Sequence, residues 1–335
     1  MKAAVIEHFG APHEVIRCGD LPDPGAPANG HVVVRMLLAP INPADLLTIG
    51  GTYGRVIEFP FVPGTEGLGR VEAVGKGVAA LKLGDLVVPM PRNTWQERLV
   101  ARESLLIKVP EDGPLEQLAM LKVNPATAQG LLSNFASLKA SDWVMQNVAH
   151  SGVGQYVIQI AARMGVNTVN VVRRAELADP LRAIGGTVVI VDDLSNPDRF
   201  ANAVKTATGG ANIRLGLDAV AGPATNAMAA ALGDNAELVV YGTLSRTPCQ
   251  IDGRLLFQHG RVLRGFWLTA WYQTTPLDQI RSLLARLAGE VAAGNLRSEI
   301  EAVYPLDRIA DAVAHAGRGG RSGKILIALA PEMAR

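Results

Sequence analysis

The sequence predicts an α/β protein in which a β-rich domain is joined to a doubly wound parallel sheet. Up to about Leu121, short alternating apolar segments are separated by glycine and proline clusters such as residues 21–30, which is typical of short strands and tight turns. From Leu121 to Gly265, apolar segments of strand length alternate with helix-like segments, as in a parallel sheet covered on both faces. A turn of small residues at 149–154 follows the first of these strands.

The individual elements follow from these local patterns. In the first region we expect strands at Lys2–Glu7, Val32–Ala39, Leu68–Val74 and Leu86–Pro89. In the second region we expect strands at 143–148, 168–172, 187–191, 214–218 and 237–241, with helices between them. The chain then closes with helices at 278–293 and 305–317 and a last strand at Lys324–Ala330. The expected domains are residues 1–121 with 269–335, and residues 122–268.

The small-residue turn resembles a phosphate-binding loop. Ala149, Ser151 and Gly154 occupy the three glycine positions of the G-x-G-x-x-G pattern, and Gly152 and Val153 lie between them. Small residues let the backbone approach a phosphate, and the free N–H groups at a helix N-terminus favour an anion. The pattern therefore predicts a dinucleotide site, with Ser151 to Gly154 against the pyrophosphate.

Two arginines indicate which dinucleotide this is. An NADH enzyme has Asp or Glu roughly 20 residues past the glycines, where it binds the ribose hydroxyls. Arg173 and Arg174 stand there instead, at the end of the second strand. A guanidinium group pairs with a 2′-phosphate through two charge-assisted hydrogen bonds, so we predict NADPH as the cofactor. The alternative is that both arginines are solvated surface charges.

Composition excludes several classes of protein. A net charge of +1 over 335 residues provides no electrostatic basis for binding nucleic acid or an anionic membrane. The first residues lack a secretory apolar region, and no apolar run is long enough to span a bilayer. Cys18 and Cys249 form no disulfide framework. We therefore expect a cytoplasmic enzyme in a reducing compartment.

Several segments together resemble the medium-chain dehydrogenase/reductase superfamily, and within it the zinc-independent 2-enoyl thioester reductases of the mitochondrial trans-2-enoyl-CoA type. The resemblance implies a GroES-like β-barrel catalytic domain and a Rossmann domain. The segments that carry it are Ile41–Asp45, Gly50–Gly54, Pro63–Gly67, Val123–Ala128, Ser151–Gln155 and Leu263–Leu268.

Residues that bind zinc in other members of the superfamily are missing. The segment 42–45 contains no cysteine, and Thr65 stands where zinc-dependent members have a histidine before the glutamate. Two cysteines cannot form a four-cysteine lobe, and the six histidines show no metal spacing. The sequence therefore predicts no metal site and favours a polarised C=C acceptor over alcohol oxidation.

Tyr53 is the candidate catalytic residue, because the resemblance puts the family's catalytic tyrosine there. A phenol stays protonated near neutral pH, so it can hold a developing enolate oxygen or deliver a proton. Its loop, with Gly50, Gly51 and Gly54, is expected to fold over a substrate. The alternative is a tyrosine that packs against the edge of the barrel.

The remaining candidates are cofactor residues. Tyr241, Gly242, Thr243 and Leu244 follow a strand at the ligand-binding edge of the sheet. The resemblance assigns Asn124 to the cofactor, and we expect Thr127 to lie beside it, although Asn-Pro is also a helix start signal. The family resemblance also implies cofactor roles for Phe266, Trp267, Leu268 and Lys324. Core or dimer packing is the alternative for the segment 266–268.

Three functions remain open. The first is NADPH-dependent reduction of a 2-enoyl thioester, and the second is reduction of a quinone or enone on the same scaffold. The third is a non-catalytic NADPH-binding protein, because a fold does not fix a function. By family analogy the chain is expected to form a homodimer through the region of Phe266.

Overall fold

A computed structural model describes residues 1–54, 57–321 and 323–333. Ser322, in the glycine-rich segment before Lys324, lies outside the described residues. The chain forms two compact units, here called the first unit (Met1–Asn124 with Leu277–Arg335) and the second unit (Pro125–Pro276). The boundaries expected from the sequence, at 121 and 268, lie a few residues ahead of these.

The first unit is built on a mixed seven-stranded sheet with the order β14-β15-β3-β4-β5-β7, and β6 also pairs with β3. Strand β3 is central because its apolar, β-branched sequence is buried along most of its length. Strands β1 and β2 form a separate antiparallel pair. The strands of this unit are β1 (Lys2–Ile6), β2 (Ile16–Asp20), β3 (His31–Pro40), β4 (Leu68–Val74), β5 (Leu86–Pro89), β6 (Arg98–Arg102), β7 (Leu106–Lys108), β14 (Ile300–Pro305) and β15 (Lys324–Ala328).

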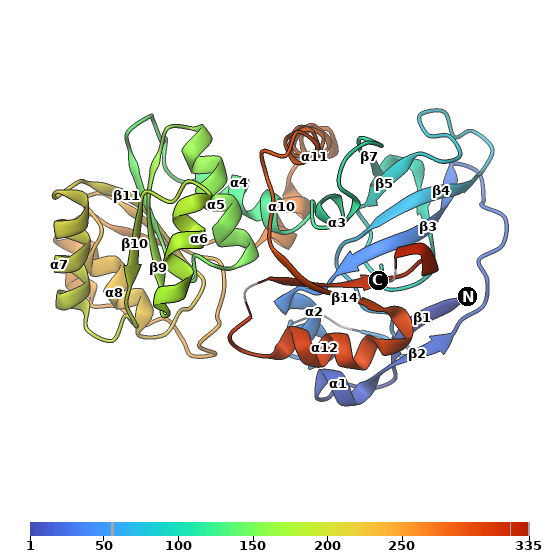
Figure 1. Cartoon of the computed structure of the whole chain (residues 1–335), viewed down its shortest axis with the longest axis horizontal. Helices are drawn as coiled ribbons and strands as arrows, with labels where there is room; N and C mark the ends of the chain where they lie inside the picture. Colours follow the sequence, from blue (N-terminus) through green and yellow to red (C-terminus); the bar gives the residue numbers. More distant parts are fainter. Residues whose placement is uncertain (55–56, 322, 334–335) are drawn as a thin grey trace. The chain divides into compact units, whose positions relative to one another are not determined.

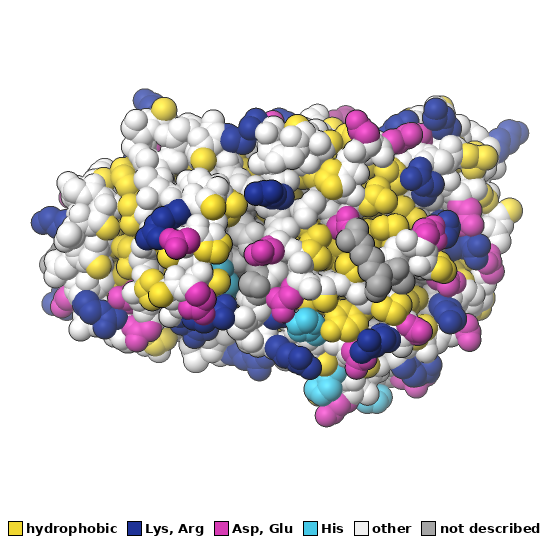
Figure 2. Space-filling view, in the orientation of Figure 1, with side chains coloured by type: hydrophobic (Ala, Val, Ile, Leu, Met, Phe, Trp, Pro, Cys, Tyr) yellow, Lys and Arg dark blue, Asp and Glu magenta, His cyan; other side chains and the backbone are white. Residues whose placement is uncertain are grey.

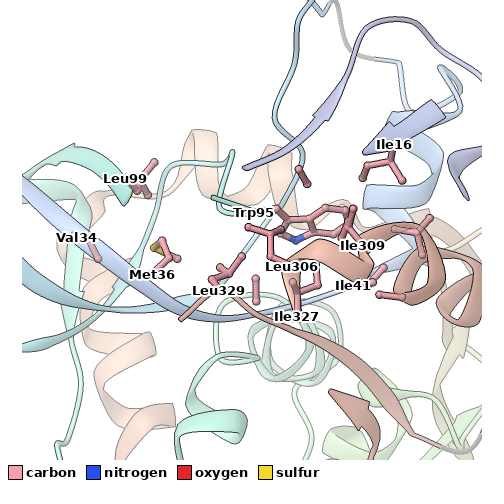
Figure 3. Close-up of a cluster of buried hydrophobic side chains, with 14 of the residues drawn as sticks. Ile16, Val34, Met36, Ile41, Trp95, Leu99, Leu306, Ile309, Ile327 and Leu329 are labelled. Carbon is pink, nitrogen blue, oxygen red and sulfur yellow. The ribbon is translucent and has the colours of Figure 1, made fainter. Parts of the chain in front are cut away.

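The hydrophobic core of the first unit contains side chains from both the N-terminal and the C-terminal parts of the chain. Figure 3 shows the indole of Trp95 packed among side chains from distant segments, with Ile41, Leu306 and Ile309 around it. Trp95 is fully buried. Burying each such aliphatic side chain contributes roughly 1.5–3 kcal/mol, so the C-terminal segment is an integral part of this unit.

The second unit is a parallel six-stranded sheet with the order β10-β9-β8-β11-β12-β13. Helices α5 and α6 lie on one face, and α7 and α8 lie on the other (Figure 1). The predicted doubly wound fold is therefore confirmed. Its strands are β8 (Trp143–Gln146), β9 (Asn167–Val172), β10 (Val188–Val191), β11 (Ile213–Asp218), β12 (Glu237–Val240) and β13 (Val262–Gly265).

Several helices begin at capping residues or prolines. Ser151 caps α5, and Asn196 caps α7, whose first residue is Pro197. The helices are α1 (Pro12–Val15), α2 (Pro43–Ile49), α3 (Leu115–Leu118), α4 (Asn124–Ser133), α5 (Gly152–Arg163), α6 (Ala178–Ala183), α7 (Pro197–Thr208), α8 (Ala224–Ala230), α9 (Gly253–Phe257), α10 (Leu268–Thr274), α11 (Leu277–Ala292) and α12 (Ile309–Gly317).

The structure corrects the predicted elements in a few places. The helix expected at 305–317 begins only at Ile309, because β14 runs to Pro305 and a short 3₁₀ turn follows. Strands β2, β6, β7, β13 and β14 were not predicted. These strands are short, and periodicity is weak over three to six residues.

Charges are mixed on the molecular surface. On the face shown in Figure 2, Lys and Arg side chains alternate with Asp and Glu, without a broad patch of one sign. Among the described residues, no helix is both long and apolar enough to cross a membrane.

Candidate active site

The carboxyl edge of the second unit's sheet carries most of the predicted cofactor residues. The strand order reverses between β8 and β11, and ligands of doubly wound sheets bind at such a point. The loops after β8, β9, β11 and β12 all leave the sheet at this edge, because these strands are parallel.

The turn after β8 has the geometry of a phosphate-binding loop. Ser151 Oγ accepts a hydrogen bond of 3.1 Å from the Gly154 N–H, and Gly152 and Val153 form the first turn of α5. A Cβ at Gly154 would lie 2.4 Å from the Ala149 carbonyl oxygen, so only glycine fits there. Helix α5 therefore packs closely against the preceding turn, which is the role of the third glycine position in dinucleotide-binding loops.

Arg173 and Arg174 follow the last residue of β9, Val172, at the same edge. Arg173 is exposed, and Nη1 of Arg174 lies 3.5 Å from a carboxylate oxygen of Glu176. This ion pair is exposed, with 39% of the Arg174 side chain accessible, so it adds little stability. A phosphate could replace Glu176 as its partner at small cost.

Asp218 is a buried anchor that the sequence analysis missed. It ends β11 and accepts hydrogen bonds from Asn147 Nδ2 at 2.7 Å and Thr225 Oγ1 at 2.8 Å. It also accepts from the N–H groups of Val220 and Ala221. These bonds fix the loop after β11. A fully buried position for an aspartate at the end of a strand, just before small residues, is the signal that could have revealed it.

The loop after β12 lies against this anchored loop. A Cβ at Gly242 would lie 2.7 Å from the Ala219 carbonyl oxygen, and the Leu244 N–H donates to that same oxygen at 3.1 Å. Burial and the nearby Asp218 raise the pKa of Tyr241, partly offset by Ser151. Thr243 and Leu244 are exposed. The four predicted residues thus lie at one edge of the sheet, together with the turn at residues 149–154.

The segment 266–268 is divided between packing and exposure. The ring of Phe266 packs edge-on against Phe135, with centroids 5.9 Å apart, and it fills the space above Gly130. Trp267 is 49% exposed and precedes α10, which begins at Leu268. The ring of Phe266 is thus partly engaged in packing, whereas Trp267 presents an apolar surface.

Asn124 and Thr127 lie in the first turn of α4 and are 6% and 7% exposed. Within the part of the chain that the structure describes, Asn124 Nδ2 has no hydrogen-bond partner. A buried amide donor without an acceptor is rare in native proteins. This orphaned donor fits a site that a polar ligand completes, so the residues present are compatible with a dinucleotide.

In the first unit, Tyr53 follows a turn that is fixed to helix α2. The N–H groups of Gly50, Gly51 and Thr52 donate to the carbonyl oxygens of Leu46, Thr48 and Leu47, respectively, at 2.9–3.1 Å. Tyr53 is half-buried, and the guanidinium carbon of Arg92 lies 5.7 Å from its ring centroid. This arrangement is a cation–π contact.

A buried polar cluster occupies the positions where zinc-dependent relatives carry ligands. Asp45 accepts hydrogen bonds from Thr65 Oγ1 at 2.5 Å and from the Asn42 N–H at 2.9 Å. Glu66 accepts from Asn42 Nδ2 at 2.9 Å and from the Val123 N–H at 2.8 Å. Burial raises the pKa of both carboxyl groups.

Two buried lysines complete this cluster. Lys324 donates to the Ile41 carbonyl oxygen at 3.1 Å and to Asn42 Oδ1 at 2.6 Å, and burial lowers its pKa to about 8. Lys122 donates to three consecutive backbone carbonyls, and burial lowers its pKa to about 7. Lys324 was expected to bind the cofactor, but two of its three N–H groups are already used within the first unit.

Lys122, Asp45 and Glu66 were not predicted from the sequence to be structural residues. Charged side chains inside apolar or proline-rich segments were the available signal. Among the described residues, no three His, Cys, Asp or Glu side chains are grouped so that they could hold a metal ion.

Comparison with known proteins identifies two family models. Residues 28–111 match the alcohol dehydrogenase GroES-like domain, and residues 152–285 match the family described as zinc-binding dehydrogenase. These matches confirm the GroES-like and Rossmann-type assignment.

Individual relatives include enoyl thioester reductases and a quinone oxidoreductase. The human mitochondrial enoyl-[acyl-carrier-protein] reductase is 37% identical over 312 residues, covering 91% of this chain and 83% of that protein. The mitochondrial 2-enoyl thioester reductase heterodimer Etr1p/Etr2p from Candida tropicalis has a TM-score of 0.86 at 28% identity, covering 98% and 99% of the two chains. A mycobacterial quinone oxidoreductase has a TM-score of 0.85 at 28% identity, with the same coverage.

The comparisons correct the predicted localisation. The expectation of a cytoplasmic enzyme rested on cysteine usage and the N-terminal sequence. The comparisons contradict this expectation, because the relatives from human, cattle and Arabidopsis are all named mitochondrial enzymes. A chain without disulfides is typical of any reducing compartment, so cysteine usage was too coarse a signal.

Proposed function

Since the chain belongs to the medium-chain dehydrogenase/reductase superfamily, among the relatives of the mitochondrial enoyl-[acyl-carrier-protein] reductases, we propose that it reduces the C=C bond of a 2-enoyl thioester with NADPH. The observation that carries this proposal is the 37% identity to the human enoyl reductase over 91% of the chain. Etr1p has been solved with NADP and crotonyl-CoA, and a mycobacterial neighbour with NADPH.

The proposed cofactor site is the carboxyl edge of the second unit's sheet. Bound NADPH supplies the hydride for the β-carbon of the acceptor. The N-terminus of α5, with Ser151 to Gly154, binds the pyrophosphate, and Arg173 and Arg174 hold the 2′-phosphate. Tyr241 to Leu244 and the segment 266–268 flank the cofactor.

Asn124 and Thr127 are proposed to orient the nicotinamide half of the cofactor. The orphaned Asn124 Nδ2 would then donate to a carbonyl or hydroxyl oxygen of the cofactor. Lys324 retains one N–H for a further contact.

Tyr53 is proposed to act on the acceptor. As hydride reaches the β-carbon, negative charge develops on the thioester oxygen, and a phenol O–H stabilises it by a hydrogen bond. The α-carbon must then receive a proton, which the same hydroxyl can deliver. The turn at Gly50–Thr52 fixes the backbone that carries this side chain.

A spectrophotometric assay tests the proposal. The purified chain is incubated with NADPH and with crotonyl-CoA, a quinone, or neither, and the nicotinamide absorbance is followed. We expect NADPH consumption that depends on crotonyl-CoA. Consumption with the quinone alone would instead support a quinone reductase, a function favoured by the mycobacterial neighbour. NADPH binding without consumption would indicate a non-catalytic protein.

A homodimer is part of the proposal. Strand β13 is the last strand of the six-stranded sheet, and Val262 on it is 40% exposed. Trp267, just beyond this strand, is 49% exposed. Val262 and Leu263 make the first half of this edge strand apolar, and an exposed strand edge is a template for pairing with a second chain.

A further inference from the structure

Arg92 follows three residues whose carbonyl groups are all bound by Lys122. Lys122 Nζ donates to the carbonyl oxygens of Pro89, Met90 and Pro91 at 3.2, 2.9 and 3.3 Å. Two of these three residues are prolines, which have no N–H to donate to a neighbouring strand. The one backbone N–H of these three residues, that of Met90, donates to the Leu105 carbonyl oxygen at 2.8 Å, and the buried ammonium binds the carbonyl groups of all three.

The residue after Arg92 is fixed as well. Asn93 donates its N–H to the Gly64 carbonyl oxygen at 2.8 Å and its Nδ2 to the Val62 carbonyl oxygen at 2.8 Å. Asn93 has a positive φ of 67°, so the chain turns sharply there. Arg92 is thus held on both sides of its backbone, and its side chain leaves from a defined point.

The guanidinium group of Arg92 lies over the ring of Tyr53, with Cζ 5.7 Å from the centroid. A cation at this distance is attracted by the negative face of the ring and disfavours other orientations of the side chain. Tyr53 itself follows the turn that Gly50, Gly51 and Thr52 fix to helix α2. The tyrosine is therefore constrained at its backbone and at its ring.

We propose that Arg92 is a positioning residue for Tyr53 and that Lys122 sets the position of Arg92 through the carbonyls of residues 89–91. The catalytic part of this inference rests on the proposed function, because only there does Tyr53 act on the acceptor. The structural part, from Lys122 through Arg92 to Tyr53, does not depend on the reaction.

Fluorine NMR tests the structural part in the whole chain. The protein is labelled with 3-fluorotyrosine, which gives one resonance for each of its five tyrosines. The Tyr53→Phe variant assigns the Tyr53 signal. We expect Arg92→Gln and Lys122→Met to shift this signal and leave the other four in place.

Lys108→Met is the matched control, because its ammonium binds Asp85 at 2.8 Å in the same unit without touching residues 89–91. It should leave the Tyr53 signal unmoved. An unshifted Tyr53 signal in both Arg92→Gln and Lys122→Met would overturn the proposal, as would equal shifts of all five signals.

A kinetic double-mutant cycle tests the catalytic part. We expect Arg92→Gln to lower kcat with crotonyl-CoA by about tenfold while the Kd for NADPH stays the same. In the Tyr53→Phe background the same substitution should change kcat less than about twofold. Arg92→Lys should restore part of the loss because it keeps the cation.

The two proposals fail differently. If the wild type turns over no enoyl thioester, the proposed function fails, while the fluorine signal still reports on the contact. If the wild type is active and Arg92→Gln lowers kcat equally in both backgrounds, Arg92 does not act through Tyr53 and the inference is overturned.

Discussion

The ammonium of Lys324 donates a hydrogen bond of 2.6 Å to Oδ1 of Asn42, which ties the last strand of the chain to the start of helix α2. The side-chain amide of Asn42 donates a further hydrogen bond to the carboxylate of Glu66. That carboxylate also accepts one from the Val123 N–H, just before helix α4. Three segments far apart in the sequence are therefore joined by one chain of buried hydrogen bonds. Removal of any member leaves charged or polar groups without partners.

Lys324→Met should destabilise the protein by about 3–5 kcal/mol, because Glu66 and Asp45 lose a nearby buried cation. Only one N–H of the lysine remains for a ligand, so the Kd for NADPH should rise no more than about tenfold. Urea unfolding and a binding titration measure the two effects. Unchanged stability with a larger loss of affinity would show that the ammonium serves mainly the cofactor.

Tyr53→Phe should lower kcat with crotonyl-CoA by about 10²–10⁴-fold, because both the hydrogen bond to the enolate oxygen and the proton donor are lost. The Kd for NADPH should stay nearly unchanged. Tyr304→Phe is the control, since that phenol binds His315 in the same unit. Steady-state kinetics and a binding titration give the answer, and full activity in Tyr53→Phe would remove Tyr53 from the mechanism.

Replacing Arg173 and Arg174 together with alanine should weaken NADPH binding by at least about tenfold and leave NADH binding nearly unchanged. A charge-assisted hydrogen bond to the 2′-phosphate is worth about 1.5–3 kcal/mol, and NADH has no such phosphate. Arg182→Ala, an exposed residue paired with Asp179, is the control. Parallel loss of both cofactors in the double variant would mean that the arginines support the fold instead.

Lys122 should make stability depend on pH. Its pKa is lowered from 10.5 to about 7 by burial, against the attraction of Glu66 and Asp45 and with repulsion from Arg92. Because the folded-state pKa is the lower one, the lysine's contribution is complete above pH 10.5 and is lost as the pH falls to about 7.

Urea midpoints between pH 6.5 and 9.5 test this prediction. The free energy of unfolding of the wild type should rise relative to Lys122→Met as the pH increases. Lys122→Arg keeps its charge throughout and should gain no such advantage. Parallel curves for the wild type and Lys122→Met would contradict the prediction.

Val262→Lys should dissociate the proposed homodimer, because it places a charge on the exposed edge of strand β13. Val191→Lys is the matched control, since Val191 lies on the opposite edge strand, β10, and is 48% exposed. Light scattering after gel filtration gives the mass of each variant. A wild-type monomer, or dissociation by Val191→Lys instead, would refute this choice of edge.

The sequence was most informative where a local pattern specifies an element by itself. Strand β9 was predicted at 168–172 and is observed at Asn167–Val172, because its valines mark it as a strand by themselves, and helix α5 follows strand β8 as expected. Strand β14 was missed because its residues are only half-buried and its pairing with β15 is a tertiary contact. Short strands of this kind are stabilised by their neighbours more than by their own sequence.

For the site, the sequence identified candidates at strand ends but not the groups that hold them. Asp218 and Lys122 contact their partners only after folding, because residues 147 and 89–91 are far away in the sequence. No local pattern records such pairings. Lys324 shows the same limit, since family resemblance suggested a ligand contact and the structure revealed a partner, Asn42, near the other end of the chain.

The interrupted first unit has a consequence for biosynthesis. Strand β3 is made early, but its neighbour β15 is translated only after the whole second unit has left the ribosome. During that interval the end of β3 at Leu38–Pro40 has no native partner on this edge, because β6 pairs only with residues 31–35, and exposed edges invite aggregation. A nascent chain stalled before residue 324 should therefore be a chaperone client, while a released full-length chain shields that edge by itself.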